Sequence, residues 1–297
     1  DALPIWGDFK YKDETFTKAV VSEGITSIGT EAFKNCNQME SIEIPSSVTK
    51  IGEGAFQYCY ALKNIEIPTR VTSIGKLAFD GCTSLESITI PSSVTNIGEQ
   101  VFKHCYFLNM EVEEGNPVYD SRNNCKAIIK TETNELVCGC RETVIPSDVV
   151  SIGDYAFIDC VSPTGNIMRI EIPEGVTRIG EGAFDYCYTL QDIVIPASVT
   201  SIGEHAFDNG AADNLVIYGK TGSYAEAYAK EHQIRFVAAE MPNPEYRNPK
   251  YEWSEDGKSC QVTLMTTTGA SITYDAAVTS EVLIPATCVE KGTTRYT

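Results

Sequence analysis

Residues 51–72 read IGEGAFQYCYALKNIEIPTRVT, and the same pattern returns along most of the chain. Its first half, I-G-x-x-A-F-x-x-C, occurs in seven copies, with Val101 replacing alanine in the fourth and Gly210 replacing cysteine in the last. The first four motif phenylalanines are each 23 residues apart, at Phe33, Phe56, Phe79 and Phe102. A fixed period of this length predicts a solenoid in which each repeat forms one coil.

The second half of the repeat predicts a short strand in every coil. In Leu62–Pro68 isoleucines alternate with polar residues, and the proline that follows fixes φ and lacks an N–H, so it ends the strand. Six prolines hold this position: Pro45, Pro68, Pro91, Pro146, Pro173 and Pro196. The glycine of each I-G pair predicts another corner of the coil, through either a positive φ or a crowded turn. The repeated Ile, Ala, Phe and Leu positions are expected to form one stacked core.

The combined pattern I-G-x-x-A-F-x-x-C-x-x-L-x-x-I-x-I-P-x-x-V-T resembles the BspA-like leucine-rich-repeat family over residues 21–238. The resemblance implies a leucine-rich-repeat solenoid, rich in β-structure, with short strands and helical turns. It also implies a secreted or cell-surface protein of bacteria that adheres to host or neighbouring-cell components. The expected localisation is therefore extracellular or at the bacterial cell surface, with any signal peptide removed.

Further segments are predicted around the repeats. Residues 1–20, with Trp6, Phe9, Tyr11 and Phe16, are expected to cap the N-terminal end, and residues 215–238, with a helix over 223–232, the C-terminal end. The period breaks between Phe102 and Phe157, which predicts an inserted β-hairpin within 106–145. Three prolines indicate a linker at 239–250. Residues 251–297 resemble a small immunoglobulin-like β module, and we expect the chain to stop short of its last strand.

Four cysteines outside the repeat motif are candidates for disulfides. If Lys130 pairs with Glu135 in the hairpin, the same register places Cys125 opposite Cys140, close enough for a bridge. The alternative is a pair of buried free thiols. Cys260 and Cys288, in the C-terminal module, could either pair or stay free.

Composition argues against several partners. Acidic residues outnumber basic ones by 41 to 23, and the formal charge of −18 repels phosphate backbones and anionic membranes. No stretch reaches the roughly 18 apolar residues that a membrane span needs. We therefore expect neither nucleic-acid binding nor membrane insertion, and the oligomeric state cannot be predicted.

No catalytic, cofactor or metal site is predicted. The three histidines lie in different elements, and neither phosphate-binding nor zinc-protease motifs occur. The repeat cysteines would stack in a row, whereas zinc needs converging ligands, so we expect packing instead of a metal site. These cysteines are Cys36, Cys59, Cys82, Cys105, Cys160 and Cys187.

Two sets of exposed residues are candidates for a binding surface. Glu43 and Glu66 should be neighbours on adjacent coils, where they would either bridge a divalent cation or stand free in water. Tyrosines flank the repeat cysteines at Tyr58, Tyr60, Tyr106, Tyr186 and Tyr188. A ridge of tyrosines would suit an extracellular protein or glycan, although packing between coils explains them too. The competing functional hypothesis is a structural spacer that displays the appended module, and an enzyme is a more distant third.

Overall fold

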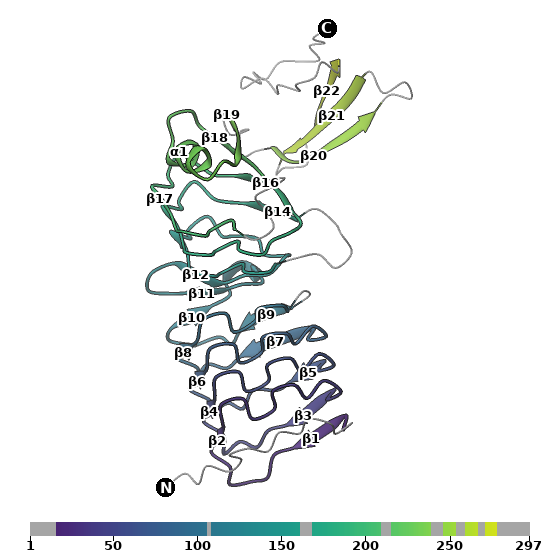
Figure 1. Ribbon diagram of the computed structural model, residues 1–297, viewed down its shortest axis with the longest axis vertical. Coiled ribbons are helices and arrows are strands. Elements are labelled where there is room, and N and C mark those ends of the chain that lie inside the picture. Colours follow the sequence, from purple (N-terminus) through teal and green to yellow (C-terminus); the bar gives the residue numbers. More distant parts are fainter. Residues whose placement is uncertain are drawn as a thin grey trace.

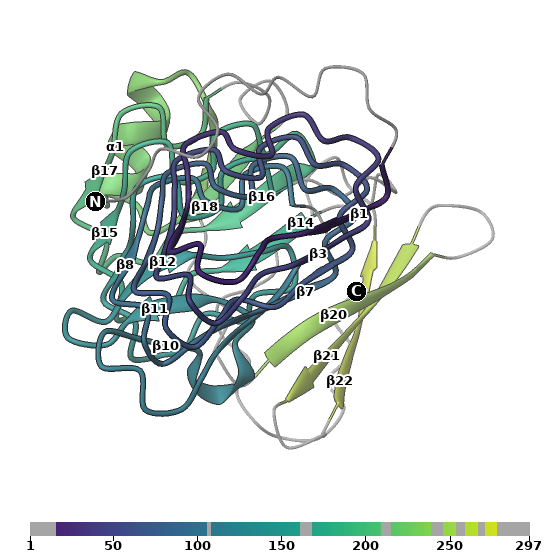
Figure 2. The ribbon, with the colours of Figure 1, turned by 90° about the horizontal axis from the view of Figure 1, so that it is seen from below.

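The computed structural model describes residues 16–105, 108–160, 168–208, 215–238, 246–253, 259–266 and 271–277. Most of them form a solenoid of about nine turns with a repeat of about 23 residues. Each coil stacks on the one before it (Figure 1), and seen along the stacking axis successive coils overlie one another (Figure 2). The predicted solenoid is therefore confirmed.

The isoleucine-rich segments form a line of parallel strands that is divided into three sheets. Within a sheet the strands of neighbouring coils pair, as Ile42 with Ile65 and Ile193 with Ile217, so equivalent side chains stack in the core. The strands are β1 (Lys18–Val20), β3 (Ser41–Glu43), β5 (Asn64–Ile65), β7 (Ser87–Ile90), β9 (Asn109–Val112), β14 (Met168–Glu171), β16 (Leu190–Val194), β18 (Val216–Gly219) and β19 (Arg235–Ala238).

A second line of strands lies just before the motif glycine and was not predicted. Each is only two residues long, too short to show an alternating pattern. Parallel pairing such as Ser27 with Lys50 links β2 (Ser27–Ile28), β4 (Lys50–Ile51), β6 (Ser73–Ile74) and β8 (Asn96–Ile97) in one sheet. A second sheet continues this line with the two-residue strands β13 (Ser151–Ile152), β15 (Arg178–Ile179) and β17 (Ser201–Ile202). The same sheet also contains β10 (Tyr119–Asp120) and the strands of the predicted hairpin, β11 (Ile128–Lys130) and β12 (Glu135–Cys138).

The motif glycines mark places of close approach between coils. A Cβ on Gly75 would lie 2.5 Å from the backbone nitrogen of Glu53 in the preceding coil, and Gly52, Gly98, Gly180 and Gly203 are similarly crowded. None of these glycines has a positive φ. Of the two expected reasons for the glycine, the crowded turn is confirmed and the left-handed conformation is wrong.

The core is a ladder of stacked phenylalanines that is interrupted once. Phe56 and Phe79 stack with centroids 5.3 Å apart, and Phe157 and Phe184 with centroids 5.2 Å apart. The first stack ends at Phe102 and the second begins at Phe157, and the buried residues accordingly form two clusters. This interruption lies where the fourth motif copy, residues 97–105, meets the chain that follows it. We call this place the junction.

The predicted hairpin fills the junction. Its strands β11 and β12 are antiparallel, with Lys130 opposite Glu135 as expected. Ile128 packs in the N-terminal cluster while Ile129 packs in the C-terminal one. The hairpin therefore acts as a layer of the stack in place of a complete coil. A short 3-10 helix, Arg122–Asn124, precedes it.

Helix α1 (Tyr224–Glu231) covers the last coils. Ser223 caps its N-terminus by accepting a hydrogen bond from the Glu226 amide, and Glu226 in turn accepts one from the Gly222 amide at 2.6 Å. Tyr228 of α1 meets the ring of Phe207 edge to face, with centroids 5.9 Å apart. At the other end, Phe16 packs partly buried against the N-terminal cluster, and the other predicted capping aromatics lie outside the described residues.

A three-stranded antiparallel sheet follows in the chain, made of β20 (Tyr246–Trp253), β21 (Ser259–Thr266) and β22 (Ser271–Ala277). Strand β20 begins inside the segment predicted as a linker. Pro249 falls where the register shifts between Arg247 and Lys250, so its missing N–H interrupts no regular ladder pair.

Candidate binding surface

The predicted tyrosines occupy two positions of the coil. Tyr58 and Tyr186 lie two residues after a motif phenylalanine, and Tyr60 and Tyr188 lie one residue after a motif cysteine. Ring centroids are 6.0 Å apart in the Tyr58–Tyr60 pair and 6.1 Å apart in the Tyr186–Tyr188 pair. The outer rings are exposed, with 46% for Tyr60 and 58% for Tyr188. Tyr106 lies outside the described residues.

The inner tyrosines have a left-handed backbone. The φ angle is 62° at Tyr58 and 59° at Tyr186, a conformation that costs a residue with a side chain about 1–2 kcal/mol. The equivalent position is left-handed in every described copy of the motif, and we call these residues the turn column: Asn35, Tyr58, Gly81, His104, Asp159 and Tyr186.

Residues of other coils form the surroundings of the two inner rings. A Cβ on Gly81 would lie 2.6 Å from Cδ1 of Tyr58, so the absence of a side chain there leaves room for the tyrosine ring. The Lys103 ammonium lies 5.1 Å from the ring centroid of Tyr186, within the range of a cation–π contact. The described tyrosines thus form two anchored pairs, one on each side of the junction, instead of one continuous row.

Between the two pairs runs a chain of polar contacts that the sequence did not suggest. Gln57 Nε2 donates to Asp80 Oδ2 at 2.8 Å, and Asp80 Oδ1 lies 2.7 Å from His104 Nδ1. On the other side of the ring, His104 Nε2 lies 3.0 Å from Asp159 Oδ2. The side chains of Asp80 and Asp159 are only 3% and 5% exposed. His104 therefore links two buried carboxylates from different halves of the solenoid.

Among the residues of this series of polar contacts, Asp159 has the least complete hydrogen bonding. Its Oδ2 atom is buried and makes no well-directed hydrogen bond, so its contact with His104 is an ion pair by distance only. Burial raises the pKa of the Asp159 carboxyl, while the positive charges of His104 and Lys103 act in the opposite direction. The negative charges of Asp80 and Asp185 raise the pKa of Asp159 further.

The two glutamates predicted to be neighbours lie on adjacent strands. β3 and β5 pair Ile42 with Ile65, which places Glu43 and Glu66 one position further along. Both are exposed, and Glu43 forms an ion pair at 2.5 Å with Lys18 of β1. The cation bridge between them stays an untested prediction.

The motif cysteines form a ladder of hydrogen bonds. The thiols of Cys59, Cys82, Cys105 and Cys187 each donate to the carbonyl of the motif phenylalanine one coil back, as Cys59 to Phe33 at 3.1 Å and Cys82 to Phe56 at 3.3 Å. Cys160 donates instead to the carbonyl of Gly139, at 3.6 Å. Burial raises the pKa of Cys82 to about 12. These contacts explain the cysteines as packing residues that satisfy turn carbonyls.

Cys125 and Cys140 are both free thiols, so the hypothesised bridge is not formed. The physical reason is a register shift between Ile128 and Ile129, which removes the simple pairing expected beyond Lys130. The Cys125 thiol donates to Ala127 O at 3.6 Å in the C-terminal cluster, and that of Cys140 to Lys126 O at 3.4 Å beside the N-terminal one. Cys288 lies outside the described residues, so the Cys260–Cys288 pair is untested.

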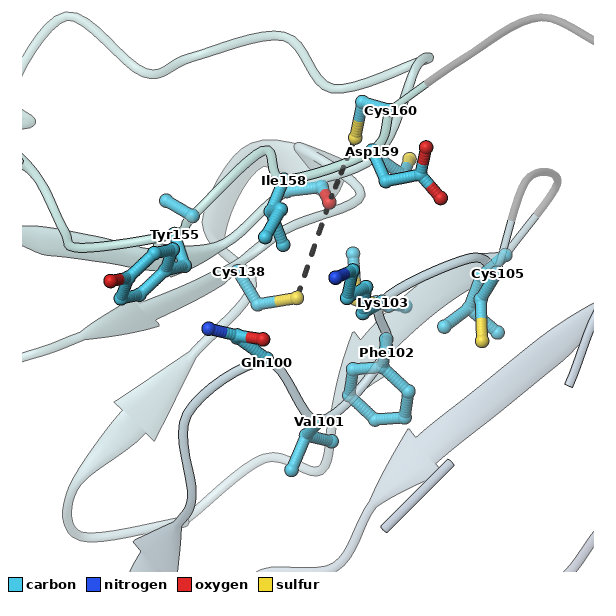
Figure 3. A pocket seen from close by; sticks show the side chains of 15 residues that line it. Gln100, Val101, Phe102, Lys103, Cys105, Cys138, Tyr155, Ile158, Asp159 and Cys160 are labelled. Carbon is cyan, nitrogen blue, oxygen red and sulfur yellow. Dashed lines mark hydrogen bonds between the residues drawn. The ribbon is translucent and has the colours of Figure 1, made fainter. Parts of the chain in front are cut away.

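Two hollows lie at the junction. The smaller, of about 20 Å³, is lined by cysteines and by Asp159, and Figure 3 shows the thiols of Cys138 and Cys160 directed toward the same carbonyl, that of Gly139. The larger, of about 240 Å³, lies between β8 and the hairpin, beside Tyr119, Lys130 and Glu135.

The described residues contain neither a metal site nor a membrane-spanning helix. Over these residues no group of three or more His, Cys, Asp or Glu side chains is placed to hold a metal ion. In the same part of the chain, no helix has the length and apolar character needed to cross a membrane.

Stacked coils, parallel strand ladders and a 23-residue motif define the class of leucine-rich-repeat solenoids. The family described as "BspA type Leucine rich repeat region" matches residues 6–125 and 136–229 in six copies. This match covers well over half of the chain. The protein belongs to the BspA-type leucine-rich-repeat family, which confirms that part of the expectation.

A solved structure of a similar protein supports the fold. A leucine-rich repeat protein from Eubacterium ventriosum is 28% identical, with a TM-score of 0.55 over 69% of this chain and 60% of that one. One from Bacteroides ovatus is 29% identical, with a TM-score of 0.49 over 74% of this chain and 51% of that one. A "leucine rich cell surface protein" from Faecalibacterium prausnitzii is 21% identical, with a TM-score of 0.38 over 76% of this chain and 92% of that one. This chain thus spans between half and three fifths of the first two proteins. No curated protein matches it.

Proposed function

We propose that this protein is a non-catalytic extracellular binding protein whose partner, a protein or glycan of a host or neighbouring cell, contacts the two tyrosine pairs. The observation that carries the proposal is the pairing of an exposed outer tyrosine with an anchored inner one in coils on both sides of the junction. Tyrosine combines a large contact area with a polar tip and loses little conformational entropy on binding.

The backbone at the inner tyrosines supports this proposal. Gly81 occupies the same turn-column position with a φ of 76°, so the turn itself does not require a side chain. Tyr58 and Tyr186 nevertheless hold large rings in a left-handed conformation. The left-handed backbone is shared by every described copy of the turn, so Tyr58 and Tyr186 differ from the other copies in the large rings that they place there. The family membership supports the proposed place at the cell exterior.

The experiment is an array of extracellular proteins and glycans probed with the full chain. The variant Tyr60→Ala/Tyr188→Ala removes both outer rings, and Tyr224→Ala serves as a matched control because Tyr224 is 44% exposed and belongs to the cap helix instead of a motif copy. Saturable binding that the double variant loses and the control keeps would support the proposal. A hit bound equally by all three proteins would place the binding surface elsewhere.

The competing function is a stiff spacer. The continuous phenylalanine stacks favour it, because regular stacking within each half of a solenoid resists bending. A spacer needs no ligand on its coils, so an array without any hit for the wild-type chain would favour it over the binding protein.

A further inference from the structure

Buried carboxylates lie between the two tyrosine pairs. Asp80 belongs to the third motif copy and Asp159 to the fifth, whereas the tyrosine pairs belong to the second and the sixth. Asp185 directly precedes Tyr186 in the sixth copy. All three carboxylates are buried, and each lies in the turn column or one residue before it. The surface between the pairs therefore has negative charge beneath it.

The charge of these carboxylates acts on the tyrosines. Partial desolvation raises the pKa of the Tyr58 hydroxyl, and the negative charge of Asp80 raises it further. The pKa of the Tyr188 hydroxyl is raised by partial desolvation first, and by the negative charges of Asp159 and Asp185 as well. An exposed aromatic ring beside a buried anion attracts a cation through both the quadrupole of the ring and the field of the anion.

Asp159 is the carboxylate that leaves room for a further positive charge. Its Oδ2 atom is buried and accepts no directed hydrogen bond from the described residues, although His104 Nε2 lies 3.0 Å away. Asp80, in contrast, accepts a hydrogen bond from Gln57 Nε2 at 2.8 Å. A buried carboxylate oxygen without a donor is destabilising, so a cation held near Asp159 offsets part of that cost.

One tyrosine ring already has a cation of this chain over it. The Lys103 ammonium lies 5.1 Å from the ring centroid of Tyr186, and its charge opposes the burial that raises the pKa of Asp159. The same cation thus acts on an aromatic ring and on a buried carboxylate. Within the described parts of the chain, no cation lies over the outer rings of Tyr60 and Tyr188, which are exposed.

The spacing of the pairs suits an extended peptide. The second and sixth copies are four coils apart. The contact between His104 and Asp159 shows that the fourth and fifth copies are neighbours on this side of the coil. Since neighbouring strands repeat at about 4.8 Å, the pairs lie about 20 Å apart along the stack, which an extended segment of about six residues covers.

The charge of the chain favours a basic partner. The formal charge of −18 attracts cations and repels anionic glycans. The lysines near the tyrosine pairs are already engaged with groups of this chain. Lys103 lies over Tyr186, and Lys34, whose charge acts on Tyr58, pairs with Glu31.

We propose that the two tyrosine pairs and the carboxylates between them bind an extended, arginine-rich segment of a partner protein. Guanidinium groups stack on the exposed rings of Tyr60 and Tyr188, and the field of the three buried aspartates stabilises their charge. Arginine suits the site better than lysine because its planar group stacks on aromatic rings. This inference rests on the proposed binding function and narrows it, since it selects a basic protein segment over a glycan.

The test is fluorescence anisotropy of the full chain with labelled peptides of about eight residues in which arginine and serine alternate. A peptide with citrulline in place of arginine has nearly the same shape without the charge, and one with glutamate reverses the charge. At about 0.15 M salt we expect the arginine peptide to bind at least about tenfold more tightly than the citrulline peptide. The glutamate peptide should not bind.

Variants separate this surface from attraction by the acidic chain as a whole. Asp159→Asn and Glu174→Gln each remove one negative charge, but Glu174 is exposed in the turn after Pro173, outside the turn column. We expect Asp159→Asn to weaken binding of the arginine peptide about three- to tenfold, and Glu174→Gln to change it by less than about twofold. The double variant Tyr60→Ala/Tyr188→Ala should weaken it by about tenfold or more.

Three results would overturn the inference: equal binding of the arginine and citrulline peptides, equal losses in Asp159→Asn and Glu174→Gln, or unchanged binding in the tyrosine double variant. The double variant keeps the test decisive if Asp159→Asn does not fold, because both of its rings are exposed. The proposed function fails separately, when the partners found on the array bind the double variant as tightly as the wild type. A partner that needs the tyrosines and proves to be a glycan would leave that function in place and overturn this inference.

Discussion

Single residues in this solenoid are constrained by the neighbouring coil more than by their own. Gly75 illustrates this, because the space for its Cβ is taken by backbone atoms of Glu53 and Gly52. Backbone cannot rotate away as a side chain can. Gly29 holds the same motif position in the first copy, where a Cβ would meet nothing within 4 Å.

Replacement of these two glycines should therefore affect the stability of the protein to different extents. We expect Gly75→Ala to lower the free energy of unfolding by about 1–3 kcal/mol through overpacking, and Gly29→Ala to change it by less than about 0.5 kcal/mol. Denaturant unfolding of both variants measures the difference. Equal losses would show that the crowding between coils is not what requires glycine.

The motif cysteines should be nearly inert in the folded chain. Burial raises the pKa of Cys82 from an ordinary value of 9.0 to about 12, and only the thiolate reacts with alkylating agents. At pH 8 we expect alkylation of Cys82 to be slower by about a thousandfold than in the chain unfolded by guanidinium. Peptide mass spectrometry after timed labelling measures both rates.

The same shift has a consequence for stability. Because the folded pKa of Cys82 is above the unfolded one, its stabilising contribution is complete below about pH 9 and is lost as the pH rises toward 12. Alkylation of Cys82 at pH 8 that is as fast in the folded chain as in the unfolded chain would contradict the burial of the cysteine ladder.

At the scale of elements, helix α1 ends the stack through local chemistry. Ser223 accepts a hydrogen bond from the Glu226 amide, and the Glu226 side chain accepts one from the amide of Gly222, one residue before the cap, in a variant of the capping box. We expect Ser223→Ala to lower the stability of the C-terminal coils by about 1 kcal/mol. Hydrogen exchange should show the loss in α1 and β19 and leave β3 and β5 unchanged. A uniform loss over the whole chain would contradict nearest-neighbour coupling.

The elements that could be predicted were those with a visible period. Isoleucine alternation before Pro68 and Pro196 was enough for one line of strands, and the helix at 224–231 followed from its helical spacing. The second line of strands was not predicted, because two-residue strands such as β4 show no pattern in the sequence. They exist only because stacking brings equivalent residues of successive coils together.

The site was only partly predictable for a related reason. Tyrosines beside a repeated cysteine can be recognised from spacing alone. The contact of His104 with Asp159 cannot, because the hairpin inserted between them breaks the period and hides which positions align. The bulge between Ile128 and Ile129, which separates Cys125 from Cys140, likewise has no signal in sequence.

At the scale of the whole molecule, the protein consists of two regular stacks joined by a hairpin layer. Each stack has its own core and presents one tyrosine pair, so a partner that contacts both pairs must span the junction. The way in which the two stacks meet at the junction therefore determines the spacing of the two pairs.

The most direct measurement is the affinity of a partner found on the array for the wild-type chain, for Tyr60→Ala, for Tyr188→Ala and for the Tyr224→Ala control. A partner that spans both pairs predicts a loss of about tenfold or more for each single variant, equivalent to at least about 1.4 kcal/mol, with no change for the control. Unchanged affinity in both single variants would contradict the proposal that the tyrosine pairs form the binding surface.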